Sequence, residues 1–472
     1  MEEDKGKDPE DGQLSSPESP QRSETSPALD KAGKGLGEGD GVRAEGGKRS
    51  KDIWVLSALL FLAALGIWGI YAQIQARRHP TKYVRIKSRH QGEVKKEWRR
   101  KKKPISWARE TLKMTKRGME WLMKQFLEKE GGWPHFQWKE PRAGAPTTAL
   151  ALFAAASQPE VIRGPYLDKL HRAAQFLISR MDSQGAVMEE DDLAYRSYTT
   201  ALSLLALVKL DKKKYATSIQ KLRAYLIRAQ LSQLPRTNWQ YGAWRYYETG
   251  DHLQSRRVDI SLTSYVLESL YESGLASSHP VFRRAYLFLR RTQNFRSDTK
   301  QYRIYDGGFA FSPRNSKAGE YRTADGDIIY RSYGSATCDG LRSLFYVGLS
   351  PTSKRVQAAL KWLERNLTLE QNPGFSPDQL TQFKRGIFYY YYHSLAKALI
   401  FRKGKKYVLI NFNQGNWHHQ MIARLKQLQR PGGEWVNKVS GMGEEHAILS
   451  TSFALLALSQ ILKVLPYSGE SF

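Results

Sequence analysis

The stretch that decides the fold is Tyr333–Pro351, with the sequence YGSATCDGLRSLFYVGLSP. Its apolar residues recur every three or four positions, a spacing that predicts a helix with one apolar face. Gly348 follows the last turn and indicates where the helix ends. Five further segments repeat this pattern: PTTALALFAA from Pro146, YTTALSLLAL from Tyr198, DISLTSYVLESLYESG from Asp259, GIFYYYYHSLAKAL from Gly386 and HAILSTSFALLALSQIL from His446.

A glycine turn precedes each copy, and in several copies a tryptophan follows the glycine, as at Trp133, Trp244 and Trp435. We expect these tryptophans to pack between repeats. A second apolar helix lies before most of the turns, so each repeat reads as a helical hairpin whose faces are buried by its neighbours. The sequence therefore predicts an all-α domain of six helical hairpins over residues 105–466.

The chain before this domain has a different composition. Residues 1–52 are rich in glycine, serine, proline and charged residues, which predicts a disordered N-terminal tail. Residues 53–72, IWVLSALLFLAALGIWGIYA, carry no charge and span about 30 Å as a helix, enough to cross a bilayer. We expect an uncleaved single-pass transmembrane anchor. Basic residues flank both of its ends, so the side of the membrane on which the domain lies stays open.

The net charge of the chain is +28, and much of it is concentrated beside this anchor. Residues 77–103 carry 13 lysines and arginines against two glutamates, and we assign 73–104 as a basic juxtamembrane linker. Beside an apolar segment, such a basic collar favours contact with anionic membrane lipid. We expect no nucleic acid partner, because motifs for base stacking or groove reading are absent. Cys338 is the only cysteine, which excludes an intrachain disulfide and thiolate metal clusters.

The alternation of glycine turns with Thr-Ala-Leu-rich helices resembles the repeats of squalene and oxidosqualene cyclases and of the β subunits of protein prenyltransferases. The segment Gln429–Trp435, QRPGGEW, is similar to the glutamine-tryptophan motif of the cyclases. This resemblance to the terpenoid cyclase/prenyltransferase superfamily implies an (α/α)6 toroid, in which outer helices surround inner helices and an apolar central cavity. It also implies an isoprenoid or other lipid as the ligand.

The resemblance implies a zinc site that this chain completes only in part. Prenyltransferase β subunits bind zinc through Asp-Gly-Cys and Tyr-His-Thr motifs, and the matching residues here are Asp339-Gly340-Leu341 and Tyr392-His393-Ser394. Leu341 replaces the cysteine, and Cys338 lies most of a helical turn away. A carboxylate and an imidazole are fewer ligands than protein zinc sites use, so we expect no metal cofactor.

The acid motif of the terpene cyclases, Asp-x-Asp-Asp-Thr-Ala, is also incomplete. Its nearest counterparts are the acidic runs at 189–192 and 325–327, and Asp259, which stands one turn before Thr263. The alternative role for Asp259 is a helix N-cap. The candidate catalytic residues are Asp339, His393 and Asp259; the first two form a general acid or base if they face each other, or else a hydrogen-bonded core pair.

Tyrosines are concentrated at the starts of the predicted inner helices. Their rings can hold an isoprenoid chain or a cation, or they can serve core packing. The candidate substrate-binding residues are Tyr198, Tyr265, Tyr333, Tyr390 and Tyr392.

Two functions remain open from the sequence. One is a membrane-anchored terpenoid cyclase- or prenyltransferase-like protein, enzyme or carrier, that holds an isoprenoid or other lipid in its central cavity. The other is a non-catalytic, membrane-tethered binding or scaffold toroid. A carbohydrate-active toroid is a weaker third alternative, indicated by a Gly131–Pro134 turn similar to one in polysaccharide lyases.

Overall fold

The computed structural model describes residues 106–136, 139–189, 195–246, 257–296, 305–324, 326–376, 381–404, 406–412 and 415–466. They belong to one of two units of the chain, Lys101–Phe472. The predicted tail, membrane anchor and basic linker lie outside the described residues. Within the described ranges, no helix combines the length and apolar character that crossing a membrane requires.

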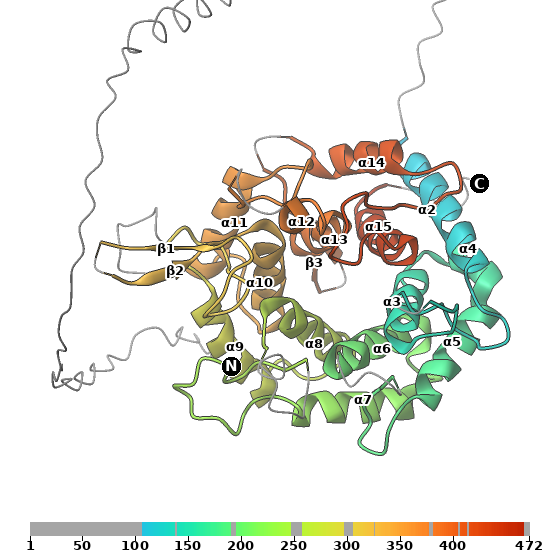
Figure 1. Ribbon diagram of the computed structural model, residues 1–472, viewed down its shortest axis with the longest axis horizontal. Helices are drawn as coiled ribbons and strands as arrows, with labels where there is room; N and C mark the ends of the chain where they lie inside the picture. Colours follow the sequence, from blue (N-terminus) through green and yellow to red (C-terminus); the bar gives the residue numbers. More distant parts are fainter. Residues whose placement is uncertain are drawn as a thin grey trace, which may run out of the picture. The chain divides into compact units, whose positions relative to one another are not determined.

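The described part of the chain is mainly helical, as predicted, and its centre is a closed ring of inner helices (Figure 1). Each inner helix packs on the next one along the chain, and the last, α15, packs back on α3. The apolar segments quoted above form these helices. They are α3 (Ala145–Ala156), α6 (Arg196–Asp211), α8 (Ile260–Glu272), α10 (Gly334–Tyr346), α13 (Phe388–Leu399) and α15 (Ala447–Leu462).

Outer helices surround this ring, and each buries one face against it. Helix α9 shows the pattern, because its buried residues Val281, Phe282, Ala285, Phe288 and Leu289 recur every three or four positions. Outer helix α7 packs on both α6 and α8, and α9 packs on both α8 and α10. The outer helices are α2 (Trp107–Lys124), α5 (Leu167–Ser179), α7 (Ala216–Arg228), α9 (Pro280–Thr292), α11 (Lys354–Asn366) and α14 (Trp417–Leu428).

Short elements interrupt the helical pattern, and two of them are β-hairpins that the sequence did not predict. Strands β1 (Glu320–Arg322) and β2 (Ile328–Tyr330) pair antiparallel in the connection before α10. Strands β3 (Ile400–Lys403) and β4 (Lys406–Leu409) pair directly after α13. Strands of three or four residues are too short to show an alternating pattern. The remaining short helices are α4 (Glu160–Arg163), η1 (Gly164–Tyr166) and α12 (Thr381–Lys384).

A glycine turn connects each outer helix to the inner helix that follows it. In three of the repeats this turn carries a buried tryptophan, whose indole donates a hydrogen bond to the preceding outer helix. The indole nitrogen of Trp133 donates to the Leu122 carbonyl at 2.8 Å, and that of Trp244 donates to the Leu226 carbonyl at 2.7 Å. Trp435 makes the same bond. All three side chains are fully buried, as expected of packing residues. The glycine of the turn has a positive φ, as at Gly242 (+88°), where a Cβ would collide with the next outer helix.

In three repeats, a glutamine after the outer helix joins the glycine turn to the neighbouring outer helix. The side-chain amide of Gln230 donates to the carbonyls of Gly242 and Val281, both at 2.9 Å. Gln293 repeats this arrangement one repeat later. Gln429 donates to Gly433 at 2.8 Å and to Met114 at 3.0 Å, and because Met114 lies on α2, this bond joins the last repeat to the first.

We predict that Gln429→Ala lowers the free energy of unfolding by about 1–3 kcal/mol, because two carbonyls and the Arg117 guanidinium lose a partner. Urea unfolding of the purified chain measures this change. Gln427→Ala is the matched control, since Gln427 is exposed on the same helix. Equal unfolding midpoints for the two variants would contradict a stabilising role for the ring-closing bond.

Candidate functional site

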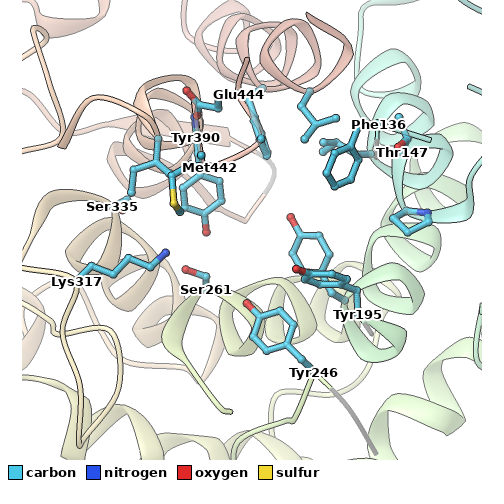
Figure 2. A pocket seen from close by; sticks show the side chains of 18 of the residues that line it. Phe136, Thr147, Tyr195, Tyr246, Ser261, Lys317, Ser335, Tyr390, Met442 and Glu444 are labelled. Carbon is cyan, nitrogen blue, oxygen red and sulfur yellow. The ribbon is translucent and has the colours of Figure 1, made fainter. Parts of the chain in front are cut away.

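A cavity of about 450 Å³ lies at the N-terminal ends of the inner helices. Each inner helix contributes a residue from its first turns, and connecting loops supply the rest of the wall (Figure 2). The volume falls within the range of roughly 300–1,000 Å³ that is usual for small-molecule sites. The inner-helix residues in the wall include Thr147, Tyr198, Ser261, Ser335, Tyr390, Leu449 and Phe453.

Aromatic rings form a continuous series along this wall. Tyr198 packs edge-on against Tyr265, with ring centroids 5.2 Å apart, and also lies beside Tyr246. Tyr390 packs edge-on against Phe453 at 5.4 Å. Such contacts fix ring orientation and leave apolar faces toward the cavity.

Tyr195 is at the rim of the cavity and has an unusual backbone. Its φ of +64° is the only positive value at a non-glycine residue in the described ranges. It lies at the start of α6, and its ring packs edge-on against Tyr246 at 5.7 Å. A strained backbone that orients a side chain toward a cavity is a common feature of binding sites.

Asp339 lies on α10, fully buried beneath the floor of the cavity. One carboxylate oxygen accepts from the Tyr390 hydroxyl at 2.7 Å and from Ser261 at 3.2 Å. The other accepts from Ser394 at 2.8 Å and from the Arg342 guanidinium at 3.1 Å. Burial raises the pKa of this carboxyl, and Arg342 opposes the shift. Both carboxylate oxygens therefore accept hydrogen bonds from protein donors. The group acts as an acceptor and presents no O–H to the cavity.

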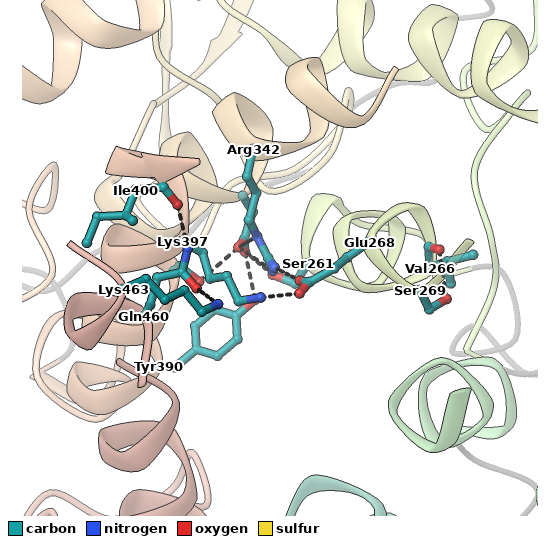
Figure 3. A network of polar contacts seen from close by, with 12 residues as sticks. Ser261, Val266, Glu268, Ser269, Arg342, Tyr390, Lys397, Ile400, Gln460 and Lys463 are labelled. Atoms are coloured by element: carbon teal, nitrogen blue, oxygen red, sulfur yellow. Dashed lines mark hydrogen bonds and ion pairs between the residues drawn. The ribbon is translucent and has the colours of Figure 1, made fainter. Parts of the chain in front are cut away.

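A buried network of charges continues from Asp339 into the centre of the ring (Figure 3). Arg342 also pairs with Glu268 on α8 at 2.5 Å, and Glu268 pairs in turn with Lys397 on α13. The side chains of Arg342 and Glu268 are at most 1% exposed. Burial acts to raise the pKa of Glu268, but Lys397 and Arg342 outweigh it and hold that pKa below its usual value. Each charge is therefore paired, which burial in a core requires.

His393 is fully buried next to this network, but it does not pair with Asp339. Neither ring nitrogen has a hydrogen-bond partner among the described residues. The imidazole instead stacks between Tyr265 and Phe453, with centroids 6.0 Å away on each side. Burial, together with Arg342, lowers its pKa well below the usual value, so the ring is neutral. The structure thus does not form the expected Asp339–His393 pair, because Arg342 and Ser394 fill the position of the partner.

Asp259 is the N-cap of α8 and is fully buried. Its carboxylate accepts from the Leu262 amide at 2.9 Å and from the Tyr246 hydroxyl at 3.1 Å. Arg257 approaches its second oxygen at 3.7 Å. Burial raises the pKa of this carboxyl, and Arg257 opposes the shift. The capping alternative for Asp259 is therefore realised, and its carboxylate also anchors two groups of the cavity wall.

Two cations line one side of the cavity, and the sequence analysis did not single out either of them. The Lys317 amino group lies 4.6 Å from the centre of the Phe311 ring and points into the cavity (Figure 2). Lys317 forms no ion pair with a described carboxylate, and burial lowers its pKa to about 8. Arg257 lies over both Tyr246 and Phe311 at 5.2 Å. These cations give one part of the cavity wall a positive charge.

Glu444 closes another side of the cavity and fixes the start of α13. Its carboxylate accepts from the backbone amides of Phe388, Tyr389 and Tyr390, at distances of 2.7 to 3.0 Å. Burial nevertheless raises its pKa to about 7, against the effect of these hydrogen bonds. This contact holds Tyr390, and through it Asp339, in place.

The candidate tyrosines divide into two groups. Tyr198, Tyr333 and Tyr390 line the cavity. Tyr265 is buried behind that wall, with the Arg342 guanidinium 4.9 Å from its ring. Tyr392 points elsewhere, because its hydroxyl donates to the Leu369 carbonyl at 2.6 Å. Four consecutive tyrosines on a helix must face different directions, and only Tyr390 of this run reaches the cavity.

The described residues contain no group of three or more histidine, cysteine or acidic side chains that could hold a metal ion. Cys338 is fully buried, and burial raises the pKa of its thiol. Glu268 and Lys397 were missed although a signal existed, since each is a charged residue among the apolar positions of an inner-helix segment. Lys317 and Glu444 lie in connections that gave no such signal.

No protein-family model matches this chain, and no curated protein sequence is significantly similar to it. Solved structures do resemble it. A variant of the type II terpene cyclase MstE from Scytonema, in complex with the product merosterolic acid A, is 14% identical over 75% of this chain and 98% of that chain, with a TM-score of 0.49. An unsaturated glucuronyl hydrolase variant with dGlcA-Glc-Rha-Glc is 12% identical over 74% of this chain and 95% of that chain, with a TM-score of 0.46. A family 76 glycoside hydrolase from a bovine Bacteroides thetaiotaomicron strain is 12% identical over 75% of this chain and 78% of that chain, with a TM-score of 0.42.

These neighbours include a terpene cyclase and two carbohydrate-active hydrolases. At such identities the similarity concerns the fold.

We predict that Glu268→Gln lowers the free energy of unfolding by about 3 kcal/mol or more, because it leaves Arg342 and Lys397 buried with one carboxylate fewer. Urea unfolding measures the loss, and Glu120→Gln on the exposed face of α2 is the control. The double variant Glu268→Gln/Lys397→Met is expected to be more stable than the single variant, since it removes one unpaired cation. A single variant as stable as the control would show that the network is not needed for folding.

Proposed function

We propose that this protein is a membrane-tethered binding toroid whose cavity holds an isoprenoid or other lipid with an acidic head group. The observation that carries the proposal is the division of the cavity wall. One part of the wall is aromatic and aliphatic, and another presents Lys317 and Arg257. The Glu444 carboxylate, which also lines the cavity, already accepts from three backbone amides. A ligand that matches both the apolar and the cationic part is an amphiphile with a long apolar part and a carboxylate or phosphate head.

The apolar side suits a branched hydrocarbon. Phe136, Leu150, Leu449 and Phe453 come from three different parts of the chain and meet in this wall. Covering the methyl groups of an isoprenoid with these side chains would contribute about 25 cal/mol per Å² of apolar surface removed from water. The six hairpins of an (α/α)6 toroid would supply one wall segment each.

The environment of Asp339 supports binding rather than polyene cyclisation. Cyclisation needs a carboxylic acid that donates a proton to the substrate. Tyr390, Ser261, Ser394 and Arg342 all donate to the Asp339 carboxylate, and Asp259 caps a helix. Neither carboxyl combines a free proton with access to the cavity.

The segments before the toroid complete the proposal. The apolar segment 53–72 would anchor the chain in the bilayer, and the basic linker 73–104 would contact anionic lipid beside it. A toroid held at the membrane surface can exchange an amphiphile with the bilayer over a short distance.

The test is native mass spectrometry and titration calorimetry of the full chain in detergent, with farnesoic acid and farnesol as probes. Farnesoic acid is expected to bind stoichiometrically and about ten- to a hundredfold more tightly than the alcohol, because a charged hydrogen bond contributes about 1.5–3 kcal/mol. Lys317→Met should remove most of this difference, and the exposed Lys438→Met should preserve it. A chain that binds neither probe would favour the scaffold alternative.

We further predict that farnesoic acid binding weakens as the pH rises above about 8. The pKa of Lys317 lies at about 8, so its amino group is cationic below that pH and loses its charge above it. The alcohol should show no such dependence. In Lys317→Met the affinity for the acid should stay level above about pH 8, where Glu444, whose pKa is about 7, is already ionised. A wild-type affinity that is constant from below to above pH 8 would remove Lys317 from the proposed head-group site.

A further inference from the structure

A second cavity, of about 200 Å³, lies at the opposite ends of the inner helices. Its wall includes Ala156 of α3, Lys209 of α6, Lys397 of α13 and Lys463, which follows α15. These residues belong to the C-terminal turns, whereas the candidate site uses the N-terminal turns. The two cavities therefore lie at different ends of the ring.

Four cations meet at this second cavity, and all but one have a carboxylate partner. Arg163 pairs with Glu160 at 2.9 Å, Lys209 pairs with Glu272 at 2.6 Å, and Lys397 pairs with Glu268. Lys463 lines the same cavity but forms no ion pair with any described carboxylate.

The contacts of Lys463 are neutral ones. Its amino group donates to the Gln460 side-chain oxygen at 2.6 Å (Figure 3). It also lies 4.8 Å from the centre of the Tyr407 ring. An ammonium group has three donors, and one of them is used here. When Lys463 is protonated, the cavity carries one positive charge more than its carboxylates balance.

We propose that this cavity binds a phosphate-type oxyanion, with Lys463 as its principal partner and Arg163, Lys209 and Lys397 around it. The cations come from four separate elements, so they surround the cavity instead of lining one edge. A tetrahedral oxyanion presents oxygens in several directions and can accept from donors on different sides. Tyr407 on β4 covers the Lys463 side of the cavity.

The charges around Lys463 make its protonation sensitive to a bound anion. Burial, followed by the repulsion of Lys397 and Lys209, lowers the pKa of Lys463 well below its usual value, while Glu272 and Glu268 oppose this shift. The other charged or titratable groups that line the cavity are Arg163 and Tyr407. A bound anion stabilises the charged form of the amino group and therefore raises this pKa again.

The competing explanation is that these lysines only neutralise the carbonyl ends of the inner helices, which carry partial negative charge. In that case phosphate neither binds nor changes the protonation of the protein.

The test is isothermal titration calorimetry of the full chain in detergent with inorganic phosphate. We expect saturable binding of one phosphate. Lys463→Met should weaken binding at least tenfold, and Lys463→Arg should restore it. Lys438→Met, at an exposed position, is the control. Because Lys463→Met removes a cation without a carboxylate partner, its urea unfolding midpoint should not fall.

A second arm separates free phosphate from a phospholipid head group. Phosphatidic acid is added to the detergent micelles, and native mass spectrometry reports whether it binds the wild-type chain and Lys463→Met. Lipid binding that is lost in Lys463→Met assigns the site to a head group, and phosphate binding without lipid binding assigns it to a soluble anion. Absence of binding in both arms, or equal binding by Lys463→Met, overturns the proposal.

Discussion

The ring depends on one bond type that repeats, the glutamine amide that joins a glycine turn to the next outer helix. In Gln230 and Gln293 it links successive repeats, and in Gln429 it links the last repeat to α2. A helical hairpin buries only part of its apolar face by itself, and an open array would leave two ends exposed. Closing the array removes both ends. The positive-φ glycine makes this closure possible, since at Gly433 a side chain would collide with the Arg117 carbonyl of α2.

A closed ring of inner helices encloses a central space that side chains must fill. The inner helices meet with apolar residues around most of their surfaces, yet Asp339, Arg342, Glu268 and Lys397 occupy the centre. Well-packed apolar residues could often replace such a network without loss of stability. The charges instead hold polar groups at defined positions, and the Tyr390 hydroxyl of the cavity wall is one of them.

The sequence predicted the ring better than it predicted the site, for a physical reason. The repeat is recognised by residues that recur, such as the turn glycine, the tryptophan and the glutamine. Each copy therefore supports the interpretation of the others. The cavity is built from residues that occur once. Asp339 was found because it stands at a motif position, and Tyr390 because it belongs to a run of tyrosines. The position of Arg342 between Asp339 and Glu268 instead depends on the packing of α10 against α8. Lys317 and Glu444 lie in connections, whose paths follow from tertiary contacts and not from periodicity.

The same charges divide the inside of the ring into two ends. Tyr390 belongs to the wall of the larger cavity and donates to Asp339, while Lys397 belongs to the wall of the smaller one and pairs with Glu268. Arg342 bridges the two carboxylates and is almost fully buried. A hydrocarbon chain cannot pass this point without separating paired charges in the core, which is strongly unfavourable. A ligand of the larger cavity must therefore fit at the N-terminal ends of the inner helices, and its length is limited by the network beneath it.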